Sequence, residues 1–577
     1  MNDIRRTILW VIFGFSMVLL WDQWQIYNGN KPTFFPSTPV APAATAKGPA
    51  GASSVPASGV PGASAVPAPV ATPSASAPGV PGAPPASAAP SAAPRERITV
   101  STDVLRLSFD TEGGSLVRAE LLKHSVDSAA DKSTSTFVLL DESANGVYVA
   151  QSGVIGGNFP NHKTPMTFSG ERSLKEGSKE LVVRFESPEQ GGVKLVKTYT
   201  LRRGGYDIGV RHEVINQGGA PVAPQLYLQL VRGATTSGGS FITNPTGTFT
   251  GPAVYTEAQK YQKVEFSDID KNKAEFQKEA TNGYVAMVQH YFASAWVLPD
   301  GVKRENFVRK LDALYAVGMI APLSPVAPGA SQAVNATLFV GPQEEKTLEQ
   351  VAPGLDLVKD YGIFTILAKP LYWLLDKIHN VLGNWGWSIM ALVLVIKIAF
   401  YWLQAKGYES MAKMKAINPK IMAMRERLKD NPQQMQQEMM RIYREEKVNP
   451  MGGCLPIMVQ IPVFIALYWV LLSSVEMRNA PWIGWIRDLA TPDPYFILPV
   501  VMTLTTLLQT ALNPTPPDPM QAKLMWYMPL AFSIMFFFFP AGLVLYWITN
   551  NVLSIAQQWM INKRMGVPPE FNLPKFR

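Results

Sequence analysis

Apolar residues gather in long runs near the C-terminus, and the length of these runs predicts helices that cross a membrane. Hydropathy places five such spans at about 384–405, 452–474, 493–512, 521–539 and 541–562. A further apolar run, residues 8–21, follows Arg5 and Arg6. It brings the expected number of spans to six, which puts both termini on the same side of the membrane.

The N-terminal run has two interpretations. A cleaved signal peptide has the same positive start, but the residues that follow, "WDQWQIYNGNK", offer no small-x-small cleavage site. We therefore interpret residues 1–30 as an uncleaved membrane anchor. Residues 31–96 are rich in Pro, Ala, Ser, Gly and Val, which cannot pack a core, and form a linker. As a flexible coil, this linker would have a root-mean-square end-to-end distance of roughly 45 Å.

Residues 97–345 change to the pattern of β-strands. Segments such as "ELVVRFES", "VKLVKTYTL" and "YDIGVRHEVIN" alternate apolar and polar residues between Gly, Asn and Pro punctuation. Many strands with few helices predict a large antiparallel sandwich. Four of the five histidines lie here and could belong to a hydrolase or sugar-modifying site, but we interpret them as packed or surface residues: His124, His162, His212 and His290.

Residues 360–383 predict an amphipathic helix that is too polar to span comfortably, because Lys369, Asp376, Lys377 and His379 interrupt its apolar positions. One interpretation is a helix that lies in the membrane interface. The other is a helix that docks the β domain. The sequence favours the interfacial helix.

The distribution of charged residues predicts which parts of the chain lie on the cytoplasmic side of the membrane. The chain has 47% hydrophobic and 17% charged residues and a net charge of +8. Segment 406–450 carries ten Lys/Arg against six acidic residues, and the tail 563–577 is basic, whereas the loop 476–494 has only Arg478 and Arg487 as basic residues. By the positive-inside rule, 406–450 and both termini are cytoplasmic and the β domain lies on the far side. The basic balance therefore requires no DNA, although a ribosomal contact stays open.

The cytoplasmic segment 406–450 predicts a hairpin of two short amphipathic helices. Asn431 and Pro432 have the character of an N-cap and first-turn pair that opens the second helix. Methionines recur at helical spacing, and either close the seam between the helices or form an adaptable surface for apolar partners: Met411, Met414, Met424, Met435 and Met439.

Lys397 lies within the apolar stretch "ALVLVIKIAFYWL". A lysine at mid-helix costs about 2.5–3.5 kcal/mol on the insertion scale, and the nine Leu, Ile, Val and Phe residues of its span return roughly 3–5 kcal/mol. Snorkelling would explain it from near a helix end, but Lys397 lies about seven residues, or roughly 10 Å, from the expected cytoplasmic end.

Other spans place polar side chains at a similar depth: Gln460, Thr505, Thr506, Gln509, Asn550 and Asn551. In lipid such groups must face the bundle interior or water. We therefore expect a polar, positively charged pocket that is open to the cytoplasm and ends near mid-membrane.

Two other functional classes fit less well. A small-solute transporter would also explain an intramembrane cation, but such transporters are usually built from repeated halves, which this chain does not show. An enzyme in the β domain would need a catalytic cluster, and the sequence has no HExxH, GxSxG or Gly-rich phosphate loop. We expect no catalytic residue, no cofactor and no metal, and we interpret the single cysteine, Cys454, as a buried thiol.

Several motifs resemble the YidC family of membrane protein insertases: "GNWGWSI" (383–389), "SMAKMKAINPKIMAMRERL" (410–428), "EKVNPMGGCLPIMVQIPVFIALYWVL" (446–471), "DPMQAKLMWYMPL" (518–530) and "FPAGLVLYWITNN" (539–551). The resemblance covers residues 360–562 closely and the β domain and first anchor more loosely. It implies a six-span inner-membrane protein of Gram-negative type, with a five-helix insertase core (384–562) and a periplasmic, sugar-epimerase-like sandwich without known catalysis.

The resemblance also implies a mechanism. The family inserts small membrane proteins and helps larger ones to fold, alone or beside the Sec translocon, without nucleotide. A hydrophilic groove attracts the polar segment of a nascent client, and the client's apolar helix moves along an apolar surface beside the groove into the bilayer. The cytoplasmic hairpin receives clients, and the C-terminal tail contacts the ribosome. Most bacterial relatives have Arg in place of Lys397, and often two tyrosines where this chain has Tyr546 and Trp547, which we expect to contact clients.

Overall fold

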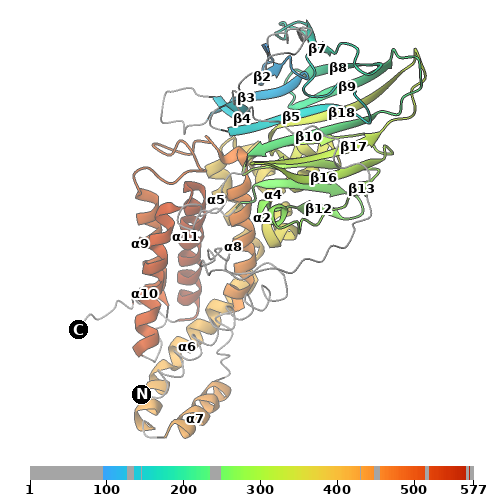
Figure 1. The fold of residues 1–577 in the computed structure, drawn as a ribbon. Coiled ribbons are helices and arrows are strands. Elements are labelled where there is room, and N and C mark those ends of the chain that lie inside the picture. Colours follow the sequence, from blue (N-terminus) through green and yellow to red (C-terminus); the bar gives the residue numbers. More distant parts are fainter. Residues whose placement is uncertain are drawn as a thin grey trace, which may run out of the picture.

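The computed structural model describes residues 95–125, 136–143, 146–233, 248–428, 431–446, 455–513, 519–566 and 571. The expected anchor 1–30, the linker up to residue 94, Cys454 and nearly all of the tail beyond 566 lie outside these residues. The described part comprises an all-β domain and a helical region below it (Figure 1).

The β domain is built from two nine-stranded sheets. In spatial order the first contains β1 (Arg97–Ser101), β2 (Leu105–Asp110), β3 (Ser115–Ser125), β4 (Thr136–Ser143), β5 (Gly146–Ile155), β10 (Gln225–Gly233), β17 (Leu314–Pro322), β16 (Arg304–Leu311) and β13 (Glu279–Ala280). The second contains β12 (Lys260–Lys263), β11 (Gly251–Thr256), β14 (Tyr284–Val288), β15 (Phe292–Val297), β18 (Ser331–Pro342), β9 (Asp207–Asn216), β8 (Val193–Arg202), β7 (Glu180–Glu186) and β6 (Thr167–Gly170). Neighbouring strands such as β8 and β9 run antiparallel, so the predicted large antiparallel β domain is confirmed.

Alternation along the strands builds the core between the sheets. In β7, Leu181, Val183 and Phe185 are buried while the residues between them are exposed, as the period of two predicts. The Phe185 ring packs against Phe109 and Tyr199 from other strands, with ring centroids 5.4 and 5.9 Å away. The apolar faces of both sheets thus meet in one core.

Several polar side chains inside the β domain are hydrogen-bonded to neighbouring side chains and to the backbone. Lys197 is fully buried, and its Nζ donates to the carbonyl oxygens of Gly113 (2.6 Å) and Ser152 (2.7 Å). His212 Nε2 lies 2.9 Å from Ser152 Oγ, and His162 Nδ1 lies 2.5 Å from the Tyr227 hydroxyl. Burial lowers the pKa of each of these histidines to about 3, with the Lys197 charge as the next cause. Both histidines are packed, as expected.

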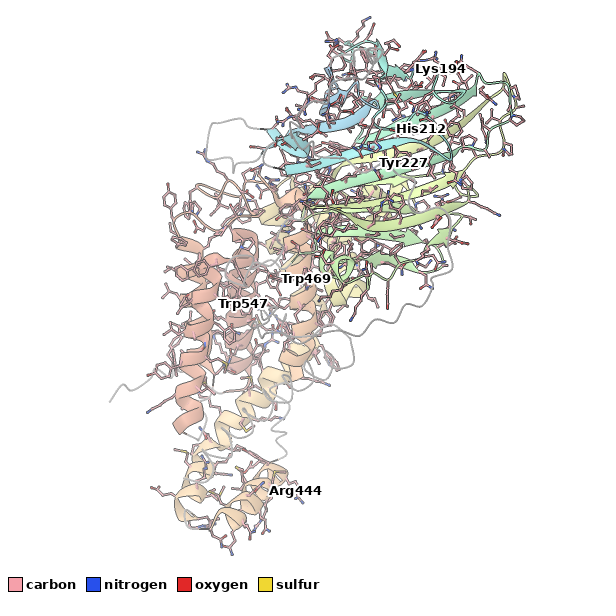
Figure 2. The ribbon with its side chains drawn as sticks, viewed as in Figure 1. Lys194, His212, Tyr227, Arg444, Trp469 and Trp547 are labelled. Carbon is pink, nitrogen blue, oxygen red and sulfur yellow. The ribbon has the colours of Figure 1, made fainter. Side chains whose placement is uncertain are left out.

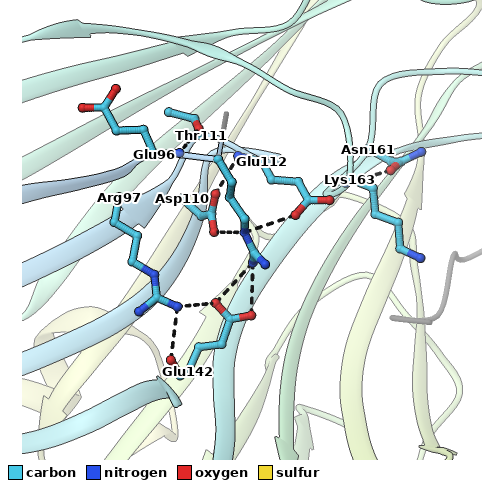
Figure 3. A network of polar contacts seen from close by, with 9 residues as sticks. Glu96, Arg97, Asp110, Thr111, Glu112, Glu142, Asn161 and Lys163 are labelled. Atoms are coloured by element: carbon cyan, nitrogen blue, oxygen red, sulfur yellow. Dashed lines mark hydrogen bonds and ion pairs between the residues drawn. The ribbon is translucent and has the colours of Figure 1, made fainter. Parts of the chain in front are cut away.

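A charged network ties the start of β1 to neighbouring strands (Figure 3). Arg95 pairs with Asp110 and, at 3.1 Å, with Glu142, which also accepts from Arg97 at 3.0 Å. The arginine side chains are half exposed, so pairs of this kind add little to stability. They connect the start of β1 to Asp110 of β2 and Glu142 of β4.

Short helices α2 (Phe266–Asp270) and α3 (Glu345–Val351) belong to the β domain, and 3₁₀ turns η1 (Leu355–Val358) and η2 (Gly362–Phe364) lead to the helical region. That region contains α4 (Thr365–Leu382), α5 (Trp385–Ala399), α6 (Tyr401–Arg427), α7 (Pro432–Glu445), α8 (Leu455–Ser473), α9 (Ile497–Leu512), α10 (Pro519–Met535) and α11 (Ala541–Arg564). The 3₁₀ turns η3 (Val475–Met477) and η4 (Phe536–Phe538) complete it.

Helices α5, α8, α9 and α10 are shorter than the spans predicted for them, whereas α11 covers its whole predicted span. Among the described residues, no single helix combines the length and hydropathy of a membrane span. Helices α5 and α6 reach the length and hydropathy of a membrane span only when they are taken together, and the chain bends by 70° at their junction. Shorter apolar segments lie at Gln460–Ser473, Ile497–Leu512 and Ala522–Phe538. The expected span 384–405 is therefore not one straight helix, because it breaks at Phe400.

The "GNWGWSI" motif forms the sharp corner between α4 and α5. Gly383 ends α4 with a positive φ of 67°, and the Asn384 side chain caps α5 by accepting a hydrogen bond from the Trp387 N–H at 3.2 Å. At Gly386, a Cβ atom would lie only 2.2 Å from the Trp482 ring. The motif is thus explained by backbone geometry and close packing.

Helix α4 docks to the β domain, whereas its interfacial position stays a prediction. Its buried face includes Tyr372 and Leu375, and Asp376 pairs with Lys346 of α3 at 2.8 Å. Lys369 pairs with Asp356 of η1. These contacts dock α4 to the end of the β domain. Its other face exposes large apolar side chains, which keeps the interfacial position as a prediction: Ile366, Trp373, Val381 and Leu382.

Arg478, in the segment after α8, inserts into the β domain. Its guanidinium donates a 2.7 Å hydrogen bond to the Ser125 carbonyl oxygen and lies over the rings of Phe137 and Phe292, at 5.3 and 5.5 Å. His290 Nε2 is 3.0 Å from the Leu472 carbonyl oxygen nearby. The β domain is therefore joined to α8 as well as to α4.

Helices α6 and α7 form the predicted hairpin, at the end of the helical region farthest from the β domain (Figure 1). The Asn431 side chain accepts from the Gln434 N–H at 3.3 Å and Pro432 begins α7, so the predicted cap is confirmed. The seam is closed by a cluster that contains four of the five predicted methionines: Met414, Met424, Met435 and Met439. Met411 is half-buried outside this cluster.

Candidate functional site

Lys397 is held in the last turn of α5, two residues before that helix ends. Its side chain is only 7% exposed, and its Nζ donates to Ser554 Oγ on α11 (2.7 Å) and to Gln404 Oε1 on α6 (3.3 Å). The ammonium group is therefore enclosed among three helices. It does not reach outward in the way that snorkelling requires.

Lys397 lines a pocket that encloses about 420 Å³ of empty space, part of it open to solvent. Helices α6, α8 and α11 supply its other polar groups, which include Gln404, and Gln460 Nε2 donates to Asn550 Oδ1 at 2.8 Å. The remaining walls are mainly apolar: Val393, Ile396, Phe400, Leu403, Val463 and Tyr546. A small set of convergent polar groups in an apolar setting is typical of a binding pocket.

Helix α11 carries two stripes of polar residues on adjacent faces, because 3.6 residues complete a turn. Asn550, Ser554 and Gln557 form the first stripe, which faces Lys397, Gln460 and α6. Asn551 and Gln558 form the second stripe, which faces α9. One helix thus serves both the pocket and an inter-helix contact.

The second stripe takes part of the predicted site away from the pocket. Asn551 Nδ2 donates to the hydroxyls of Thr505 (3.2 Å) and Thr506 (2.9 Å), both on α9. Gln509 is half-buried on α9. The pocket is lined by Lys397, Gln460, Tyr546 and Asn550 of the eight predicted residues, but not by Thr505, Gln509, Trp547 or Asn551.

An apolar pocket of about 1580 Å³ of empty space, part of it open to solvent, lies between α8, α9 and α10. Trp469 on α8 and Trp547 on α11, both labelled in Figure 2, line it together with Phe464, Met528, Phe532 and Phe536. The Trp547 ring packs against Phe464 and Phe536, at centroid distances of 4.7 and 5.0 Å. Tyr546 and Trp547, adjacent in sequence, therefore belong to different pockets.

Gln404 and Ser554 contact Lys397 but were not among the predicted site residues. Ser554 follows Asn550 by four residues, a spacing that places both on one helix face and could have revealed it. Gln404 lies beyond the break at Phe400. A straight helix through 384–405 would place its side chain on the same face as Lys397 but two turns, or roughly 10 Å, away, so the bend was the missing information.

The electrostatic character of the Lys397 pocket is positive and uncompensated. No acidic residue lines it, and none of the ion pairs in the described ranges includes Lys397.

Elsewhere in the described chain, Glu345, Glu349 and Asp356 bring carboxylates within 4.8 Å of one another. Two of them have partners already, since Asp356 pairs with Lys369 and Glu345 accepts from Tyr361.

Comparison with protein families divides the chain into two matched regions. The model described as the YidC periplasmic domain matches residues 97–374, and the model described as 60Kd inner membrane protein matches residues 377–567. The boundary between them lies in α4, the helix that docks the two regions together.

Curated relatives match over nearly their whole length. The membrane protein insertase YidC of Cupriavidus necator is 53% identical over 572 residues, covering 98% of each chain. That of Ralstonia nicotianae is 54% identical over 569 residues, with the same coverage. Among solved structures, an active YidC insertase with its first transmembrane domain resolved matches 80% of this chain and 91% of its own, at 18% identity and a TM-score of 0.36.

These findings define the class of protein: an inner-membrane insertase with a periplasmic domain, which is not an enzyme. Of the functional classes that the sequence leaves open, the insertase is the one that these findings show. The chain belongs to the YidC family. Its substrates are nascent membrane proteins.

Proposed function

We propose that the chain inserts its clients by a division of labour between the two pockets. The Lys397 pocket receives the polar or acidic segment that must cross the membrane, while the apolar pocket beside Trp547 guides the client's hydrophobic helix into lipid. One observation carries the proposal: a lysine without an acidic partner is buried beside Gln460 and Asn550, with an apolar pocket on the adjacent face of α11. An intramembrane ionisable residue of this kind is typical of a substrate path.

The topology that we propose has six spans, with both termini and the α6–α7 hairpin in the cytoplasm. The charge asymmetry between segment 406–450 and loop 476–494 supports this orientation. The exposed apolar face of α4 supports an interfacial position at the periplasmic side. The Lys397 pocket then opens toward the cytoplasm, the side from which nascent clients arrive.

We also propose that the hairpin receives clients, and that the chain works alone or beside the Sec translocon with its basic tail near the ribosome. Four of the predicted methionines close the seam, so the receiving surface consists of other side chains. Met422 on α6 and Met440 on α7 are 52% and 45% exposed. Flexible thioether side chains of this kind adapt to varied apolar partners.

Site-specific cross-linking tests the division of labour. A photoreactive residue replaces Val463 in the Lys397 pocket, Phe532 in the apolar pocket, or Val381 on the exposed face of α4 as a control. We expect the translocated segment of a stalled single-span client to cross-link to position 463 and its apolar segment to position 532. Equal labelling of all three positions by both segments would contradict the proposal.

A further inference from the structure

The ammonium group of Lys397 is held by neutral acceptors from two other helices. Ser554 Oγ on α11 is 2.7 Å away and Gln404 Oε1 on α6 is 3.3 Å away. Ser554 is 2% exposed and Gln404 is 7% exposed, so both contacts lie inside the protein. Buried hydrogen bonds to a charged group are among the stronger ones.

Ser554 uses its hydrogen-bond donor and one of its acceptor positions at this point. Its hydroxyl donates to the Asn550 carbonyl oxygen at 2.7 Å, which fixes the direction of its lone pairs. It accepts from Lys397. A hydroxyl held in this way cannot rotate away from the lysine without losing its bond to Asn550.

The lysine keeps one hydrogen-bond donor and has no acidic partner among the residues that line the pocket. An ammonium group has three N–H donors, and Ser554 and Gln404 occupy two of them. An acidic partner would cancel the positive charge, whereas a hydroxyl and an amide oxygen fix its position and leave the charge intact. Since Lys397 lines the pocket, the remaining donor is available there.

We propose that Ser554, aided by Gln404, is a positioning residue that fixes the Lys397 ammonium against α11 and so makes the pocket selective for acidic client segments. The proposal rests on the proposed function. What it adds is the positioning: the contacts of Ser554 and Gln404 hold the ammonium group where it acts on an acidic segment, and their loss slows an acidic segment more than a neutral segment of the same size.

Two matched clients test this in proteoliposomes that contain the full chain. Both clients are versions of the same single-span protein: the translocated segment carries two Asp residues in one and two Asn residues in the other. The readout is the initial rate at which each segment becomes protected from protease. We expect Ser554→Ala to slow the acidic client about tenfold and the neutral client less than about twofold, because a charge-assisted hydrogen bond is lost.

Three further variants separate positioning from folding. Ser554→Thr keeps the hydroxyl and should restore the acidic client. Ser388→Ala removes another buried serine that bonds the carbonyl four residues earlier on its helix, at 2.7 Å, and should leave both clients unchanged. In a Lys397→Ala background, Ser554→Ala should have no further effect, because the two residues act as a unit. If Ser554→Ala is not recovered folded, Gln404→Leu is tested with the same clients and should slow the acidic one selectively.

Equal slowing of both clients by Ser554→Ala would assign the residue a structural role and overturn the inference, as would no slowing of either. Failure of the unaltered chain to protect either client would instead contradict the proposed function. The two failures are therefore distinguishable within one experiment.

Discussion

Gln460 Nε2 on α8 donates a 2.8 Å hydrogen bond to Asn550 Oδ1 on α11, and this bond joins two walls of the pocket that contains Lys397. Both residues are half-buried. The bond contributes to the packing of the helices and to the polarity of the pocket at the same time. Substitutions at this pair therefore separate stability from function.

The variants Gln460→Leu and Asn550→Leu each leave one carboxamide without its partner. We expect each to lower the free energy of unfolding by about 1–2 kcal/mol, and the double Leu variant to recover much of the loss, because both polar groups are then replaced. Insertion of an acidic client should remain low in the double variant, since the pocket has become apolar. Thermal unfolding in detergent and client protection in liposomes measure the two effects. Recovery of both properties together would contradict a role for the polar wall.

The contacts of Arg478 allow a prediction of how strongly the β domain is attached to the helical region. Replacing it with Lys keeps the charge but loses the planar guanidinium that lies over Phe137 and Phe292 and bonds the Ser125 carbonyl oxygen. We expect a loss of about 1–2 kcal/mol, measured as a lower Tm of the full chain. Arg487→Lys, an exposed arginine in the same loop, is the matched control and should leave Tm unchanged. Equal effects of the two substitutions would show that Arg478 does not anchor the domain.

The buried histidines predict a pH dependence of the β domain. Burial lowers the folded-state pKa of His212 to about 3, whereas an unfolded histidine titrates near about 6.5. Between these values the unfolded chain binds more protons, so stability is complete above about pH 6.5 and is lost as the pH falls toward 3. Each such histidine contributes about 1.4 kcal/mol per pH unit in this window.

The variant His212→Gln tests this directly. Its Tm should fall less between pH 7 and pH 5 than that of the unaltered chain, because one of the groups that take up a proton on unfolding is gone. The Tm at both pH values is measured by near-UV circular dichroism. An unchanged difference between the two pH values would show that His212 does not carry the dependence.

Periodicity in the sequence was sufficient to predict the larger features of the fold. The alternation in "ELVVRFE" predicted β7 and its buried face, and Asn431 with Pro432 predicted the start of α7. Both signals are local, since they depend on residues a few positions apart. The pairing of β5 with β10, far apart in the chain, is a long-range contact that no local pattern specifies.

The candidate site was predictable only in part, for the same reason. Hydropathy identified Lys397 and Gln460 as polar residues in apolar helices, but not which face each side chain occupies. The structure separates Asn550 from its neighbour Asn551, because successive helical residues point about 100° apart. Gln404 reaches Lys397 only because the chain bends by 70° between α5 and α6.

The central claim is that the positive charge of Lys397 drives client entry. The most direct test is the initial rate of protease protection of an acidic single-span client in liposomes that contain the unaltered chain, Lys397→Arg or Lys397→Ala. We expect the unaltered chain and the Arg variant to insert the client and the Ala variant to be at least about tenfold slower, because one lost charge interaction of this size changes a rate by that factor. Equal rates for all three proteins would contradict the account. Client entry would then depend on the shape and hydration of the pocket and not on the charge of Lys397.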